Sequence, residues 1–147
     1  MFDTLLRRLM APGPGRIPEY DARLALAALL VRIARADERY AAPEVAHIDA
    51  TLQSLYRLTG PEVAALRADA EVLEAEAPDT VRFTRALKEA VPLQDRTALI
   101  EAMWSVALSH DGRASEEEAV LRLAANLLGL SDVESAQARQ RVERRGA

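Results

Sequence analysis

Four acidic residues stand in two equally spaced pairs along the chain. Glu44 follows Asp37 by seven residues, and 74 positions further on Glu118 follows Asp111 at the same spacing. Carboxylate oxygens are the ligands that hard cations such as Ca²⁺ and Mg²⁺ prefer in proteins. Asp37, Glu44, Asp111 and Glu118 are therefore the candidate ligand- or metal-binding residues of this sequence.

Each acidic pair lies at the same kind of junction. An apolar stretch precedes each aspartate, at 28–36 and 102–110, and an amphipathic stretch follows each glutamate. At the offset of 74, Leu30 corresponds to Trp104. Repeated helix–loop–helix units pack on one another because neither unit can bury its apolar face alone. The sequence therefore predicts one pseudo-symmetric helical domain with two acid-bearing loops in equivalent positions.

The hydrophobic periodicity predicts an all-α single domain of about seven to eight helices, because no segment shows sustained period-2 alternation. Residues 1–17 are expected to hold an amphipathic N-terminal helix and a Pro/Gly linker, and 18–147 the domain. Leu24–Val31 is apolar nearly all round, which indicates a central helix packed on most sides. Thr59 and Ser131 are predicted N-caps, and Ser115 with Glu118 a capping box. The expected helices cover about 18–36, 43–58, 59–75, 78–91, 93–109, 115–129 and 131–147.

Composition excludes several classes of protein. The net charge of −4 argues against a nucleic-acid-binding protein that relies on broad positive charge. The chain has no cysteine, which rules out disulfides and thiolate metal sites. The N-terminus lacks the features of a secretory signal, and no apolar run approaches a membrane span, so we expect a cytoplasmic location. The C-terminal basic cluster is interpreted as a solvated helix end; it comprises Arg139, Arg141, Arg144 and Arg145.

The repeated pattern resembles the TerB-like family, which is named for tellurite-resistance proteins and includes the N-terminal domain of DjlA-type DnaJ-like proteins. The matching residues are Ala36-Asp37-Glu38 with Glu44, and His110-Asp111-Gly112 with Glu118, and the resemblance covers about residues 18–145. Two positions depart from the pattern: Glu38 replaces a glycine and His110 an alanine. The resemblance implies an all-helical two-repeat domain, a link to tellurite or general stress responses, and partner proteins near the inner membrane. It implies no established reaction.

Two alternatives remain open for the four acids. If the two central helices pack antiparallel, the two loops lie at opposite ends, whereas a roughly parallel packing would let the carboxylates converge. Aligning Gly112 with the invariant glycine of an EF-hand puts Ala107 where the first carboxylate ligand is required, so this is not a working EF-hand. The acids otherwise brace turns and cap helices, with Arg39 and Arg113 neutralising them.

Histidine and tryptophan are interpreted structurally. Glu44 and His47 have the Glu-x-x-His spacing of di-iron bundles, but the second copy has Leu121 in the corresponding place. We therefore expect His47 to be a partly buried helix residue bonded to a neighbour. Trp104 lies midway along the second central helix, and we expect it to be largely buried.

No catalytic set is found in the sequence, since it contains neither a Gly-x-Ser-x-Gly elbow nor a phosphate-binding glycine loop. The leading hypothesis is a non-enzymatic adaptor that recruits other proteins, membrane-associated ones among them, without a cofactor. The alternative is a metal- or small-ligand-sensing domain that uses the repeated acidic loops. The N-terminal segment is expected to dock on the domain, lie on a membrane surface or stay mobile, and the sequence does not give the oligomeric state.

Overall fold

The computed structural model describes residues 19–36, 40–77, 79–109 and 115–146. These residues form seven α-helices and one short 3₁₀ helix, with no strand among them, which confirms the all-α prediction. The predicted helix in residues 1–17 lies outside the described residues. The elements are α2 (Glu19–Arg35), α3 (Ala42–Tyr56), α4 (Gly60–Glu76), α5 (Val81–Ala90), η1 (Leu93–Asp95), α6 (Arg96–Ala107), α7 (Ser115–Leu127) and α8 (Asp132–Gly146).

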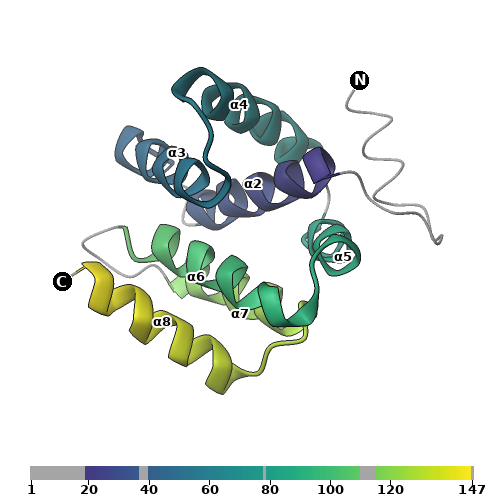
Figure 1. Ribbon diagram of the computed structural model, residues 1–147, viewed down its shortest axis with the longest axis vertical. Coiled ribbons are helices and arrows are strands. Elements are labelled where there is room, and N and C mark those ends of the chain that lie inside the picture. The colour runs from purple at the N-terminus through teal and green to yellow at the C-terminus, as the bar shows by residue number, and fades with distance from the viewer. Residues whose placement is uncertain (1–18, 37–39, 78, 110–114, 147) are drawn as a thin grey trace.

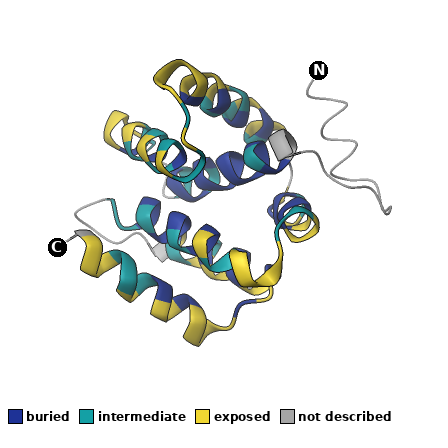
Figure 2. Cartoon of the chain, viewed as in Figure 1, coloured by how far each residue is buried: buried dark blue, intermediate teal, exposed yellow. Residues whose placement is uncertain are grey.

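The helices form two groups joined by a central helix. Figure 1 shows α2, α3 and α4 in one half, α6, α7 and α8 in the other, and α5 to one side. Helix α2 contacts α3, α4, α5, α6 and α7, so it belongs to the core of both halves. Every residue of Leu24–Val31 is at most 1% exposed, and Figure 2 shows α2 buried along most of its length. The predicted central helix is confirmed.

Helix boundaries follow local capping chemistry. The Thr59 hydroxyl accepts the Glu62 N–H at 3.2 Å, and the Glu62 carboxylate accepts the Thr59 N–H at 2.9 Å. Ser131 and Glu134 repeat this capping box before α8. Both predicted N-caps are therefore confirmed. Gly129 adopts a φ of 85° after α7, a conformation that favours glycine and ends the helix.

The predicted helix at 93–109 is interrupted near its start. Its first residues form the 3₁₀ turn η1, and α6 proper begins at Arg96. The Arg96 guanidinium donates hydrogen bonds to the carbonyls of Lys88, Val91 and Leu128, each at 3.0 Å. This side chain therefore binds the ends of α5 and α7 to the start of α6.

Trp104 anchors α8 on α6. Its side chain is 3% exposed, which confirms the prediction of burial. The indole N–H donates to the Ser135 hydroxyl at 3.1 Å, and the Arg139 guanidinium lies 4.9 Å from the ring centroid. No helix in the described part of the chain is long and apolar enough to cross a membrane.

Candidate functional site

The structure describes two of the four predicted site residues. Glu44 is the third residue of α3 and is 4% exposed. Glu118 lies in the first turn of α7, where its carboxylate pairs with Arg139 at 3.2 Å. Asp37 and Asp111 lie outside the described residues. The side chain of Ser115 also lies outside them, so the Ser115–Glu118 capping box stays a prediction. Within the described ranges, no group of three acidic or histidine side chains is arranged to hold a metal ion.

The buried acid of α7 is Glu117, a residue outside the predicted set. Glu117 is 0% exposed and, like Glu44, is the third residue of its helix. Its i+4 and i+8 neighbours, Leu121 and Ala125, are buried in the same way as those of Glu44. A glutamate in the first turn is favoured by the positive end of the helix dipole. The offset that pairs Glu44 with Glu118 is therefore one residue too long for these helices.

The spacing of apolar residues is the signal that identifies Glu117. Counting four and eight residues from Glu118 leads to Arg122 and Asn126, which are exposed. A glutamate that shares a helix face with them cannot point into the core, because residues four apart lie on the same side. Alignment on the two aspartates pairs Glu44 with Glu118, whereas position in the helix and burial pair it with Glu117.

The first turns of α3 and α7 lie at the same end of α6. His47, near the start of α3, bonds to Ser105, near the end of α6. Glu118 reaches the same end of α6 through Arg139, which lies over Trp104. These contacts place the starts of α3 and α7 near the same end of α6. In the described part of the chain, α3 and α7 nevertheless do not pack extensively on each other.

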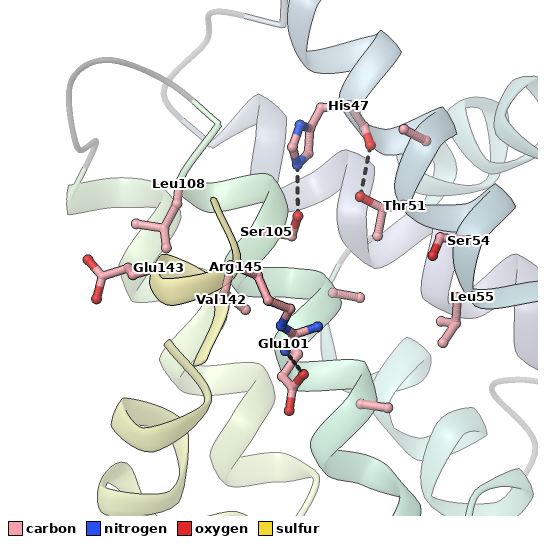
Figure 3. A pocket seen from close by; sticks show the side chains of 13 residues that line it. His47, Thr51, Ser54, Leu55, Glu101, Ser105, Leu108, Val142, Glu143 and Arg145 are labelled. Atoms are coloured by element: carbon pink, nitrogen blue, oxygen red, sulfur yellow. Dashed lines mark hydrogen bonds and ion pairs between the residues drawn. The ribbon is translucent and has the colours of Figure 1, made fainter. Parts of the chain in front are cut away.

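An open groove of about 800 Å³ separates α3 from α6 and the end of α8 (Figure 3). Its α3 wall carries small side chains, including Ala50 and Ser54, and its α6 wall carries Ala98 and Ala102. Small side chains let another chain approach the helix backbones closely. The complete lining is His47, Ala50, Thr51, Ser54, Leu55, Ala98, Glu101, Ala102, Ser105, Leu108, Val142, Glu143 and Arg145.

The charged residues of the groove are already in ion pairs. The Glu101 carboxylate accepts hydrogen bonds from Arg141 at 2.9 Å and from Arg145. Burial acts to raise the pKa of Glu101, but the two guanidinium groups outweigh it and hold the pKa below its ordinary value. Glu143 lies 3.7 Å from Arg139. The charges of the groove are therefore largely compensated by their ion pairs. Its remaining polar groups are hydroxyls and one imidazole.

The C-terminal arginines are part of this arrangement. Arg139 pairs with Glu118, while Arg141 and Arg145 pair with Glu101 on α6. Arg139 departs from the interpretation of the cluster as a solvated helix end, because its side chain is 17% exposed. Arg141 and Arg145 pair with Glu101 but stay accessible to solvent, at 40% and 64% exposed. All three bind α8 to the body of the domain, because the matching acids lie on helices distant in sequence.

His47 and Ser105 form a polar contact between the α3 and α6 walls of the groove. His47 Nε2 lies 2.8 Å from Ser105 Oγ, and Thr51 Oγ1 donates to the His47 carbonyl (Figure 3). Burial lowers the pKa of His47, partly opposed by the bond to Ser105, so the neutral imidazole is favoured. The expectation of a partly buried histidine bonded to a neighbour is confirmed.

A serine bonded to a histidine is also the beginning of a hydrolase triad, so its surroundings decide its role. Among the described residues, no carboxylate is bonded to the His47 ring to orient it. Ser105 lies inside α6, where backbone N–H groups are used by the helix and cannot form an oxyanion hole. The pair is therefore arranged as a helix–helix contact. Sequence reasoning missed Ser105 because no motif marks it.

Comparison with known proteins gives the family. Neither a curated protein nor a solved structure matches the chain. The family model described as "Tellurite resistance protein TerB" matches residues 23–140, which run from α2 into α8 and include every wall of the groove except the end of α8. The match covers most of the chain and agrees with the all-α fold and with the resemblance noted in the sequence. The chain belongs to the TerB family of tellurite-resistance-type domains.

Proposed function

We propose that this TerB domain is a non-enzymatic protein-interaction module, and that the groove between α3, α6 and α8 receives an amphipathic helix of a partner protein. The observation that supports this most strongly is an open groove of about 800 Å³ with small side chains on both main walls. Helix-in-groove binding uses such a surface, since an apolar helix face needs close approach and few charged contacts.

The electrostatics of the groove favour an apolar occupant. Glu101 is neutralised by Arg141 and Arg145, so an ionic ligand would have to break existing pairs. The exposed hydroxyl of Ser54 and the side chain of Thr51 are uncharged groups that can meet the polar edge of a helix. A charged small molecule is therefore a poorer fit than an uncharged helix face.

The test places a photo-crosslinking amino acid at Ser54 in the groove, with the same amino acid at Ala68 on the exposed surface of α4 as the control position. A partner captured from Ser54 is identified, purified and mixed with the full chain. We expect its captured segment to gain helical circular dichroism on binding, because an isolated short helix is marginal in water.

Filling the groove should then weaken binding. Ala50→Gln with Ala98→Gln adds two uncharged side chains to facing walls, and Ala68→Gln with Ala119→Gln adds the same atoms to exposed positions on α4 and α7. We expect at least about tenfold weaker binding for the first pair, which corresponds to ~1.4 kcal/mol, and no change for the second. Equal affinity for all three proteins would refute the groove as the binding surface, and reproducible turnover of a substrate would refute a non-enzymatic role.

A link to tellurite or general stress is part of the same proposal and rests on the family. The test compares growth on tellurite of cells that lack this protein with cells that carry the wild-type or the groove-filled chain. We expect wild-type protein to restore growth and the groove-filled chain to fail. Restoration by both would separate any tellurite phenotype from the groove.

A further inference from the structure

The chain itself contains a segment that matches the occupant which the groove favours. On a helix, Phe2, Leu5, Leu6 and Leu9 fall within an arc of about 100°, since successive residues are turned by about that angle. Arg7 lies on the opposite face, and Arg8 lies to one side of the apolar arc. A helix with this sequence would therefore present one continuous apolar face.

The described chain begins close to the groove. Arg23, in the second turn of α2, lies with its guanidinium 4.8 Å from the centroid of the Tyr56 ring. Tyr56 is the last residue of α3, and its neighbour Leu55 lines the groove. The start of α2 is thus beside the end of α3, where that wall of the groove finishes.

The linker is long enough to reach along the groove. Residues 11–18 precede α2 and contain Pro12-Gly13-Pro14-Gly15, which cannot form a continuous helix. Eight extended residues span at most about 26 Å, and nine helical residues are about 14 Å long. Such a short tether also holds the segment at a local concentration of the order of millimolar.

We propose that residues 2–10 of this chain bind in the groove between α3, α6 and α8 as a short amphipathic helix. Phe2, Leu5, Leu6 and Leu9 face the small side chains of the walls. Arg7 and Arg8 stay in water, so that the existing ion pairs of Glu101 are undisturbed. A partner helix that uses the groove must then displace this segment; the displacement, but not the docking, rests on the function proposed above.

The docking is tested by paramagnetic relaxation in the full chain. Because the sequence has no cysteine, Thr4→Cys provides a single attachment site for a nitroxide, on the polar face of the segment. We expect the amide signals of Ser54, Ala98 and Ala102 to fall below about half of their intensity in the reduced sample, since a millimolar local concentration keeps even a weak helix largely bound. Signals around Ala68 on the outer face of α4 should keep theirs.

Paired variants separate apolar docking from general attraction. Leu5→Glu with Leu9→Glu places charges on the apolar face and should abolish the broadening in the groove. Arg7→Glu with Arg8→Glu changes the charge by a larger amount but leaves the apolar face intact, and should preserve it. Loss of broadening in both variants, or in neither, would overturn the proposal.

Mixing experiments identify other occupants. When spin-labelled chain at natural isotope abundance is added to ¹⁵N chain that carries no spin label, we expect no broadening in the groove. Broadening there would show that a second copy provides the segment and would overturn intramolecular docking. The absence of groove broadening in the full chain would also overturn it, while leaving partner crosslinking at Ser54 as a separate result.

A measurement of partner affinity tests whether a partner helix must displace residues 2–10. A segment that occupies the groove for about 90% of the time weakens partner binding about tenfold. The Leu5→Glu/Leu9→Glu chain should therefore bind the purified partner about tenfold more tightly than the wild type. If the segment docks but the affinity is unchanged, the partner binds elsewhere and the function proposed for the groove fails, whereas the docking stands.

Discussion

Replacing Trp104 should reveal how firmly α8 is bound to α6. The side chain is 3% exposed and donates its indole N–H to Ser135, which is also 3% exposed, at 3.1 Å. Arg139 lies over the same ring at 4.9 Å and pairs with Glu118. One residue therefore combines buried area, a buried hydrogen bond and a cation–π contact.

The contacts of Trp104 predict how much stability each variant at this position should lose. Trp104→Ala removes the whole ring and should lower the free energy of unfolding by about 3–5 kcal/mol. Trp104→Phe keeps a ring under Arg139 but leaves the buried Ser135 hydroxyl without its donor, at a cost of about 1–3 kcal/mol. Adding Ser135→Ala to Trp104→Phe removes that hydroxyl, so the double variant should lose less than the sum of the two single variants, by about 1 kcal/mol.

Urea unfolding followed by far-ultraviolet circular dichroism measures the wild type and all of these variants, because the chains altered at position 104 lack the only tryptophan. Leu123→Ala, at a position 49% exposed on α7, is the control and should change stability by no more than about 0.5 kcal/mol. The reasoning is refuted if Trp104→Ala costs no more than this control, or if Trp104→Phe and Ser135→Ala are simply additive. A wild-type emission maximum typical of full water exposure would contradict the burial itself.

Three further predictions concern other contacts. Arg96→Lys should lower the free energy of unfolding by about 2 kcal/mol in urea titrations, since an ammonium group cannot bond to the three carbonyls that the guanidinium binds. The exposed Arg122→Lys is the control, and equal effects of the two changes would contradict the prediction. The pKa of His47 is lowered in the folded state, so the unfolded chain takes up the proton first and stability should fall as the pH drops below about 6.5. The contribution of His47 to this pH dependence of the unfolding free energy should vanish in His47→Gln. An unchanged pH dependence in that variant would show that other groups cause it. Ca²⁺, Mg²⁺, Mn²⁺ and Zn²⁺ should leave the melting temperature of the wild type and of Glu118→Gln unchanged, because the Glu118 carboxylate is engaged by Arg139. A rise of several degrees in the wild type that Glu118→Gln abolishes would support the cation-sensing alternative.

Part of the candidate site could be predicted from sequence and part could not. The types of residue at the two junctions and the structural role of His47 were predictable, since they depend on spacing along one helix. Glu117 was missed because the alignment relied on the loop residues, although the apolar residues that follow it on the helix indicate the correct register. Ser105 and the groove were not predictable, because they exist only where α3, α6 and α8 come together.

Local sequence alone specifies most of the helices, two of their N-caps and the helix that is buried. Leu24–Val31 is apolar on every side, and Thr59 and Ser131 can satisfy the N–H groups of a first turn, so local chemistry alone specifies these features. Which charges are neutralised and which surfaces stay open depends instead on how the helices pack. Arg141 lies 40 residues from Glu101, and only the packing of α8 on α6 brings these side chains together. The physical reason is that periodicity reports which face of a helix is buried, whereas ion pairs and grooves depend on which other helix meets that face.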